Sequence, residues 1–503
     1  MVNRVIVLGG GSAGFLAAIT LKTRLPELQV VVIRSKDIGI IGVGEGTTVS
    51  VPNFLHGYLK IDPLEFQRIA RPTYKLGIRF LWGPRPFFNY TFSTQFDHQY
   101  RALSRPTGFY CQDERETEFA SINSALMSLG KAFIRLPDGA PGIRNDVAYH
   151  IENADFVKFL ETQAARVKVE VVDDTVSHVD QDDSGIVALN CKATGAQRAD
   201  LYIDCSGFYS VLLSKTLGEP FVSFKSSLFC DRAVVGGWAR PEGEEILPYT
   251  TAETMDAGWC WQIEHENRVN RGYVYSSAFI SDEAADAEFR RKNPRVDSTR
   301  IVKFVSGRYA RGWVKNVVAI GNSNGFVEPL ESTSLAAICE ECHALAVSLA
   351  DCGREPGPAL AAVYNRHNQR TWDDIRRFLA IHYRFNTRLN TDFWRAARSD
   401  TDLAGAEDYV DFYAENGPSV AWKSTLITGR DVFGFEGWLA MMVGQNVPYR
   451  RRFRPDDHER QLWRGITDAH RAQAAASLTV REALDVVRSP QWRTRPDFFR
   501  YPY

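Results

Sequence analysis

Apolar and polar positions follow different spacings in successive parts of the chain. Residues 5–8 are a continuous apolar run typical of a buried strand, and after a glycine-rich turn a helical pattern extends through Leu21. Residues 30–33 predict a second buried strand. Between about 165 and 315, segments such as KVEVVDD, GIVALNC and RGYVYSSAFI predict further strands. After Leu335 the spacing becomes helical, as in LAAICEECHALAVSLA.

This order of elements predicts an α/β protein with two modules. Strand, glycine turn, helix and strand are the parts of a Rossmann-like nucleotide-binding unit. We expect that unit, with β-rich insertions that face a substrate, to cover residues 1–345. A mainly helical substrate module is expected over residues 346–503, and 503 residues are enough for two such modules.

The first turn has the spacing of a dinucleotide site. Gly9-x-Gly11-x-x-Gly14 lies between the predicted strand and helix, where backbone N–H groups at the helix start can face a pyrophosphate. The acidic residue that usually ends the second strand is replaced by Arg34. A 2′-phosphate would explain an arginine at that position, and Asp37 is an alternative ribose contact.

Composition excludes several classes of protein. The 60 basic and 61 acidic residues nearly cancel, which argues against a nucleic-acid or membrane-surface partner. Eight scattered cysteines suit a reducing compartment, and Cys339-x-x-Cys342 is interpreted as part of a helix because no second ligand pair has zinc-site spacing. No apolar segment has membrane-spanning length, and the glycine-rich N-terminus does not read as a signal peptide. We expect a cytoplasmic protein without a metal.

Two later segments place small residues where a backbone must approach a ligand closely. They are DCSGFYS at 204–210 and AIGNSNGFVEPLESTS at 319–334. Each alone is a turn, but in order behind the first glycine motif they match the nucleotide-contact segments of flavoproteins with a hydroxylase-type FAD fold.

Together these motifs resemble those of the tryptophan halogenase family of flavin-dependent halogenases. The resemblance spans residues up to about 445. Beyond the glycine turn, it rests on IGVGEGTT (41–48), TYKLGIRF (73–80), AYHIENADFVKFL (148–160), DCSGF, Trp259-x-Trp261-x-Ile263, EPLESTS and FLAIHYRF.

The resemblance implies an enzyme that uses reduced FAD, O2 and chloride or bromide to halogenate an aromatic carbon, with hypohalous acid relayed to a lysine. It implies cofactor contacts from three glycine-rich segments: Gly9, Gly11, Ser12, Ala13, Gly14, Gly42, Gly44, Glu45, Gly321 and Asn322.

Lys75 corresponds to the family's catalytic lysine and Glu331 to its catalytic glutamate, with Ser332 beside it. The pattern over 74–82 predicts one strand whose apolar face carries Tyr74, Leu76, Ile78, Phe80 and Trp82, so Lys75 and Arg79 point to the other face. A desolvated ammonium loses its proton more easily, and the lysine can either hydrogen-bond an oxidant or accept halogen as the neutral amine. We expect Glu331 to offset charge on the arene and to orient Lys75.

The helix start after Glu331 is a candidate halide site. Ser332 or Thr333 could cap the helix, and N–H groups around Thr333 and Ser334 would favour an anion. The family usually has glycine where this chain has Ser334, so halide geometry or preference could differ.

Trp259, Trp261 and Ile263 share one face of a predicted strand. By resemblance they separate the flavin from the organic substrate, although two tryptophans packed in a core would show the same spacing. Glu264 replaces the family's proline, so the strand need not bend or end there in the usual way.

The substrate is expected to be an indole or another electron-rich arene. AEDYVDFYAENG at 406–417 does not match the segment that clamps the amino acid group of free tryptophan, and Trp438, Phe433 and Phe435 are candidate stacking residues that could equally be core. A separate NAD(P)H-dependent flavin reductase is expected because no second dinucleotide motif is visible, and a homodimer is compatible with the sequence. The alternatives are a flavin-dependent aromatic monooxygenase and a non-catalytic flavin-binding protein.

Overall fold

The N-terminal apolar run forms the middle of a parallel sheet in this computed structural model. The structure describes residues 1–39, 42, 44–92, 102–104, 111, 117–420, 423–427, 432–490 and 492. Within them this sheet has the strand order β20 (Trp313–Val314), β21 (Val317–Ala319), β12 (Leu201–Asp204), β1 (Arg4–Leu8), β2 (Gln29–Arg34) and β8 (Glu170–Asp173). All neighbours are parallel except β20 and β21. The predicted nucleotide-binding strands β1 and β2 are confirmed.

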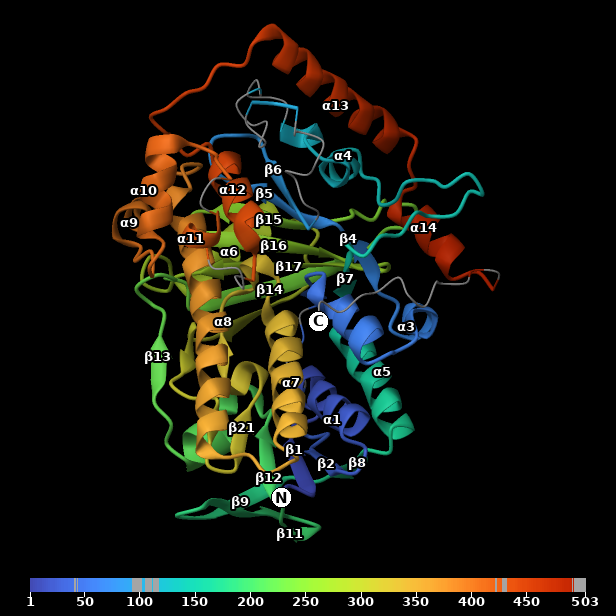
Figure 1. The fold of residues 1–503 in the computed structure, drawn as a ribbon, viewed down its shortest axis with the longest axis vertical. Coiled ribbons are helices and arrows are strands. Elements are labelled where there is room, and N and C mark those ends of the chain that lie inside the picture. Colours follow the sequence, from blue (N-terminus) through green and yellow to red (C-terminus); the bar gives the residue numbers. More distant parts are fainter. Residues whose placement is uncertain are drawn as a thin grey trace.

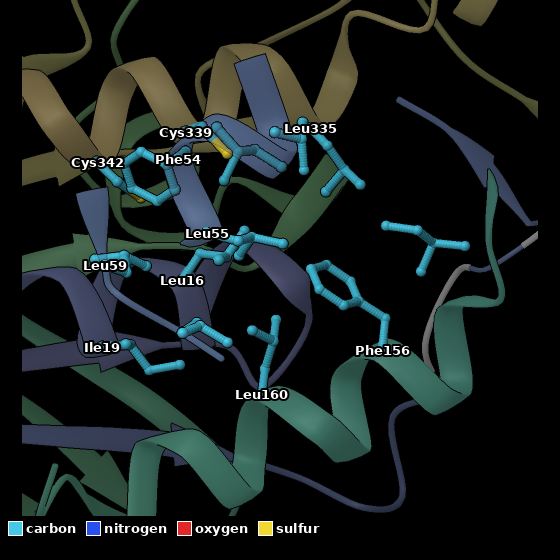
Figure 2. Close-up of a cluster of buried hydrophobic side chains, with 14 of the residues drawn as sticks. Leu16, Ile19, Phe54, Leu55, Leu59, Phe156, Leu160, Leu335, Cys339 and Cys342 are labelled. Carbon is cyan, nitrogen blue, oxygen red and sulfur yellow. The ribbon is translucent and has the colours of Figure 1, made fainter. Parts of the chain in front are cut away.

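Helix α1 (Ser12–Arg24) connects β1 to β2 and is buried on nearly all sides. Figure 2 shows Leu16 and Ile19 of α1 packed against Phe156 and Leu160 of α5 (Asn153–Arg166). Cys339 and Cys342 of α7 (Ser334–Asp351) close the same cluster, so the interpretation of this Cys pair as helix residues is confirmed. The packing fixes the first glycine turn between three helices.

A second, larger sheet lies above the parallel one in Figure 1. Among the described residues its order is β18 (Thr299–Lys303), β14 (Arg232–Ala239), β17 (Arg268–Tyr275), β16 (Gly258–Glu264), β15 (Thr250–Met255), β5 (Gly77–Leu81) and β6 (Phe88–Thr91). Only the β15–β5 pair is parallel. The strand-rich stretch predicted between 165 and 315 is confirmed.

Three small sheets complete the β structure of the described chain. They contain β3 (Glu45–Gly46), β7 (Ala148–Ile151) and β4 (Thr73–Lys75); β11 (Gly195–Gln197), β10 (Gly185–Cys191) and β9 (Val176–Asp182); and β13 (Phe221–Ser223), β19 (Gly307–Tyr309) and β22 (Gly325–Phe326).

The prediction of one continuous strand through Lys75 is wrong. Strand β4 pairs with β7, whereas β5 pairs with β6 and β15 in the large sheet. Between them, the backbone N–H of Leu76 donates to Pro248 O. Tyr74 therefore packs in the N-terminal core, while Phe80 packs in the core of the large sheet. Lys75 lies where these two cores meet.

The described chain is mainly helical from residue 334 onwards, as the sequence pattern predicts. They are α7, α8 (Pro358–Phe385), α9 (Asp392–Asp400), α10 (Glu407–Asn416), α11 (Lys423–Leu426), α12 (Gly434–Gly444), α13 (Asp457–Ala475) and α14 (Val480–Val487). Besides α1 and α5, the remaining α-helices of the described chain are α2 (Ser50–Pro52), α3 (Pro63–Ile69), α4 (Ile122–Ser128) and α6 (Asp282–Lys292). Figure 1 shows α7 and α8 running from the parallel sheet towards the large sheet. No described helix is both long and apolar enough to cross a bilayer.

Candidate active site

The first glycine turn is a compact cradle at the start of α1. Gly9 has φ +125°, and a methyl group on it would lie 2.2 Å from Cys205 O. A methyl group on Gly14 would lie 1.9 Å from Gly9 O, whereas the space beside Gly11 is open. Helix α1 has no side-chain cap at Gly11, so its first N–H groups remain available to an anion. These features fit a pyrophosphate.

A cavity of about 810 Å³ opens from this turn. Of the predicted cofactor contacts, it is lined by Gly9, Gly11, Ser12, Ala13, Gly44, Glu45 and Asn322. Gly14, Gly42 and Gly321 lie outside the lining and shape the turns behind it. Ile41 and Val43 of the IGVGEGTT motif lie outside the described residues. The volume is in the range of cofactor sites.

The third glycine segment is held by a glutamate that the sequence analysis did not single out. Glu341 of α7 accepts hydrogen bonds from Gly321 N at 2.7 Å, Asn324 Nδ2 at 2.6 Å and Trp372 Nε1 at 3.2 Å. Burial raises the pKa of Glu341 to about 7, although these donors oppose the shift. The signal available in the sequence was a charged residue inside an apolar helix.

Arg34 borders the cavity, but its charge has a partner within the fold. Its Nη2 and Nη1 atoms lie 2.5 and 3.1 Å from the two carboxylate oxygens of Glu161 on α5. The side chain also packs beside Gly10, where an added methyl group would lie 2.5 Å from its Cβ. Asp37, the alternative ribose contact, is exposed and does not line the cavity.

Lys75 lies behind the cavity wall and is inaccessible to solvent. Its Nζ donates to Ser332 Oγ at 2.6 Å and to Thr47 O at 3.0 Å. Burial lowers the pKa of Lys75 to about 7, and the charge of Glu331 opposes that shift. A methyl group on Gly46 would lie within 3.0 Å of Lys75 Nζ and Ser332 Oγ. Because Gly46 and Ser332 line the cavity, the lysine is one layer of atoms away from it.

Glu331 turns to His382 rather than to Lys75. His382 Nε2 lies 2.6 Å from Glu331 Oε1, and both side chains are buried. His382 Nδ1 faces Phe378 O at 2.8 Å and must carry a proton, because a carbonyl can only accept. One further proton is therefore shared between Nε2 and Oε1. Burial raises the pKa of Glu331. Sequence reasoning quoted the FLAIHYRF motif but gave His382 no role.

The helix start after Glu331 differs from the prediction. Helix α7 begins at Ser334 with Thr333 as its N-cap, and neither Ser332 nor Thr333 makes a side-chain cap. Ser332 has φ +57°, which turns its hydroxyl towards Lys75. The buried Thr333 Oγ1 has no hydrogen-bond partner among the described residues. The first-turn N–H groups of α7 and this hydroxyl thus remain as donors beside the cavity, which Ser334 lines.

Trp259, Trp261 and Ile263 lie on one buried face of β16, as predicted. Trp261 and Ile263 line the cavity, and the ring of Trp259 lies 6.0 Å from that of Trp261. Gly272 is the cross-strand neighbour of Trp261, and a methyl group on it would lie 2.0 Å from the indole. The indole therefore packs over a glycine and keeps one position. Glu264 is the last residue of β16 and pairs with Val269, so the strand ends at this position and does not run past it.

The candidate substrate residues lie near His382, but they differ in burial. Phe433 stacks on Phe378 with ring centroids 3.8 Å apart, and Phe378 contacts His382 at 4.9 Å. Trp438 is fully buried against Phe378, which matches the interpretation as core, and Phe435 packs on Tyr409. Phe433 is partly exposed.

Comparison with known proteins identifies relatives along almost the whole chain. The model of the family "Tryptophan halogenase" matches residues 4–458. Tryptophan 7-halogenase KtzQ from Kutzneria sp. (strain 744) is 34% identical over 82% of this chain and 81% of its own length. Tryptophan 6-halogenase ThaL from Streptomyces albogriseolus is 31% identical over 82% of both.

Solved structures agree. MibH, described as a "lathipeptide tryptophan 5-halogenase", superposes with a TM-score of 0.89 and 39% identity over 97% of this chain and 94% of its own. Xcc4156, a flavin-dependent halogenase from Xanthomonas campestris, superposes with a TM-score of 0.83 and 27% identity over 96% and 98%.

Proposed function

The chain belongs to the tryptophan halogenase family, and from that premise we propose that it halogenates an electron-rich aromatic carbon with reduced FAD, O2 and chloride or bromide. One observation carries the proposal. A buried Lys75 with a pKa near 7 lies 2.6 Å from Ser332, directly behind a cavity that is built on a dinucleotide-type turn. Flavin binding alone would not need a buried lysine at this point.

The cavity residues fit FAD in chemistry and in shape. Gly9, Gly11 and the start of α1 would hold the pyrophosphate, and the turn at 321–322, fixed by Glu341, would contact the same cofactor. Arg34 and Glu161 would border its nucleotide end. When bound and reduced, FAD supplies the two electrons with which O2 is reduced as halide is oxidised to hypohalous acid.

Lys75 would then accept the halogen. In the proposed step the neutral amine attacks the halogen of hypohalous acid, the N–X bond forms as the X–O bond breaks, and water leaves. Transfer of X to the arene restores the amine when the ring loses its proton. The charge of Glu331 acts on Lys75, and the pair that Glu331 makes with His382 can relay that proton from the ring to the lysine nitrogen.

Halide would bind at the start of α7. The first-turn N–H groups, the hydroxyl of Thr333 and the backbone of Ser334 point to an anion at the cavity edge. In this proposal the halide lies on the cofactor side of Lys75. Thr333, the N-cap residue, makes no side-chain cap on α7.

Trp261 and Ile263 would keep the organic substrate away from the cofactor. Only small species could then pass to Lys75, which favours halogenation over oxygenation. A flavin monooxygenase is the alternative if this wall leaks.

An indole is the proposed substrate class, with Phe433 as a stacking residue. The acidic side chains of 406–417 point outwards: Glu407, Asp408, Asp411 and Glu415 are all exposed on α10. They do not form a clamp for the amino group of free tryptophan. This exposure, together with the 39% identity to a protein described as a "lathipeptide tryptophan 5-halogenase", favours as the second candidate an indole carried on a larger molecule such as a peptide.

Mass spectrometry tests the proposal. Purified protein, a separate NAD(P)H-dependent flavin reductase, O2 and bromide or chloride are incubated with indole, tryptophan and a tryptophan-containing peptide. We expect halogen isotope doublets that disappear in Lys75→Ala but persist in Lys158→Ala, which changes an exposed lysine of α5. Oxygenated product would favour the monooxygenase. Oxidation of NADPH by the protein alone would contradict the need for a reductase.

A further inference from the structure

The polar face of strand β16 ends in a buried ion pair. Side chains alternate along the strand, so Cys260, Gln262 and Glu264 point to the face opposite Trp259, Trp261 and Ile263, three residues that we call the tryptophan wall. Glu264 pairs with Arg240, and their side chains are only 1% and 2% exposed. Gln262 Nε2 donates to the second carboxylate oxygen of Glu264 at 2.5 Å. Both oxygens of this carboxylate are therefore satisfied without solvent.

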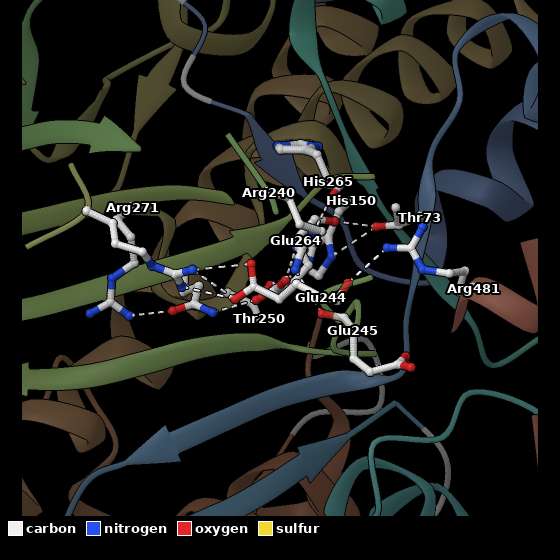
Figure 3. Close-up of polar contacts among 12 residues, drawn as sticks. Thr73, His150, Arg240, Glu244, Glu245, Thr250, Glu264, His265, Arg271 and Arg481 are labelled. Atoms are coloured by element: carbon white, nitrogen blue, oxygen red, sulfur yellow. Dashed lines mark hydrogen bonds and ion pairs between the residues drawn. The ribbon is translucent and has the colours of Figure 1, made fainter. Parts of the chain in front are cut away.

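Arg240 follows β14 directly and connects the end of β16 to the loop after β14. Besides Glu264, its Nε donates to His265 O at 3.1 Å and its Nη1 to Glu245 O at 2.8 Å. Figure 3 shows the guanidinium of Arg240 with Glu264 and His265 gathered around it. A buried arginine with these partners fixes where β16 ends, because each of its three nitrogens donates to an acceptor.

The same residue is tied to the strand that carries Lys75. Thr73 Oγ1 donates to Glu264 O at 2.5 Å. Thr73 and Lys75 are two residues apart in β4, so their side chains share one face of the strand. A shift of Glu264 would therefore move the strand from which Lys75 projects.

A third contact reaches the cofactor loop. His265 follows Glu264 in the hairpin, and its ring lies over Gly44. A methyl group on Gly44, which has φ +74°, would lie 2.4 Å from His265 Nε2 and 2.5 Å from Asn270 Nδ2. Gly44 lines the cavity. Residues 264–265, at the end of β16, thus contact both β4, which carries Lys75, and the cofactor loop at Gly44.

We propose that Glu264, held by Arg240, is a positioning residue. It keeps the tryptophan wall of β16, Lys75 of β4 and the cofactor loop at Gly44 in fixed positions relative to one another. The proline usual at this position would keep a carbonyl for Thr73 but would leave Arg240 buried without a charge partner. The expected effect of Glu264 on the yield of halogenated product per reduced flavin rests on the proposed function. Its expected effect on the local order of the backbone does not.

Hydrogen–deuterium exchange without added cofactor tests whether Glu264 holds these three segments in place. In Glu264→Gln, amides of 258–264, 73–76 and 44–46 should exchange on the order of tenfold faster than in the wild type, because loss of a buried charge partner favours local opening. Glu253→Gln is the matched control, since it removes the carboxylate partner of Arg271 in the same sheet. It should leave 73–76 and 44–46 unchanged. Unchanged exchange of 73–76 and 44–46 in Glu264→Gln, or equal acceleration there in the control, would overturn the proposal.

Thr73→Val covers the case in which Glu264→Gln does not fold. It removes one hydroxyl at constant shape and should loosen 73–76 while β16 stays protected. In a turnover assay, Thr73→Val and folded Glu264→Gln should release more hydrogen peroxide or free hypohalous acid per reduced flavin and yield on the order of tenfold less halogenated product. Wild-type coupling in both variants would refute the positioning role. Absence of halogenated product from the wild type would instead count against the proposed function and leave the exchange result to decide.

Discussion

His382 and Glu331 share one proton across a 2.6 Å contact that solvent does not reach. Because His382 Nδ1 must donate to Phe378 O, only Nε2 can exchange a proton with the glutamate. His382→Gln would keep a hydrogen bond but could not take up that proton. We expect turnover to fall about 10- to 100-fold, equivalent to about 1.4–2.7 kcal/mol, with flavin affinity unchanged.

The control for this variant is a second buried histidine away from the site. His56 bonds to Ile61 O through Nδ1 and to Tyr149 OH through Nε2. His56→Gln should lower stability but not the rate of single-turnover halogenation. If His382→Gln halogenated at the wild-type rate, the shared proton would have no part in catalysis.

Lys75 gives the reaction a defined pH dependence. Its pKa is lowered to about 7, so the neutral amine dominates above pH 7 and falls about tenfold per pH unit below it. The halogenation rate should therefore rise between about pH 6 and 8 and then level off. Lys75→Arg should be inactive across this range because arginine stays protonated. A rate that falls as pH rises from 6 to 8 would contradict an amine acceptor.

Glu328 should make the fold less stable at pH 7 and above than at pH 4. Its carboxyl is completely buried near Trp259, Tyr383 and Cys230, and burial raises its pKa from 4.5 to about 7. The folded protein binds this proton more tightly than the unfolded chain, so stability is lost as pH rises from about 4.5 to 7. Glu328→Gln should remove this loss and gain about 3 kcal/mol at pH 8 but nothing at pH 4. Urea unfolding at the two pH values measures the difference, and an equal effect at both would contradict a raised pKa.

Gly272 should control the tightness of the tryptophan wall. A methyl group there would lie 2.0 Å from Trp261, so Gly272→Ala must displace the indole. We expect oxygenated or unhalogenated by-products to increase relative to halogenated product. Gly465→Ala is the control, because its added methyl group meets nothing within 4 Å on α13. An unchanged product ratio in Gly272→Ala would mean that the wall does not depend on the position of Trp261.

Local patterns predicted the parts of this site that are continuous in sequence. The glycine turn, the strand with Trp259 and Trp261, and the helix after Glu331 follow from residue spacing. The break at Leu76 could not be predicted, because it depends on which partner strands flank β4 and β5. Pairings such as His382 with Glu331 and Arg240 with Glu264 join residues 51 and 24 positions apart, and no local period encodes them. Ser332, one of the two predicted caps, is not available to α7 for the same reason, since its hydroxyl bonds to the distant Lys75.

Helix α7 sets the distance between the region of Lys75 and Glu331 and the cofactor turn at Gly321. Ser334 begins it beside the lysine and glutamate, and Glu341, seven residues later, grips the turn at Gly321. That separation is about 10 Å along the axis, and each residue turns the helix by about 100°. A one-residue insertion or deletion between them would swing Glu341 away from Gly321 even if every side chain were kept. Insertions and deletions should therefore be tolerated in surface loops, whereas within residues 334–341 they should abolish function.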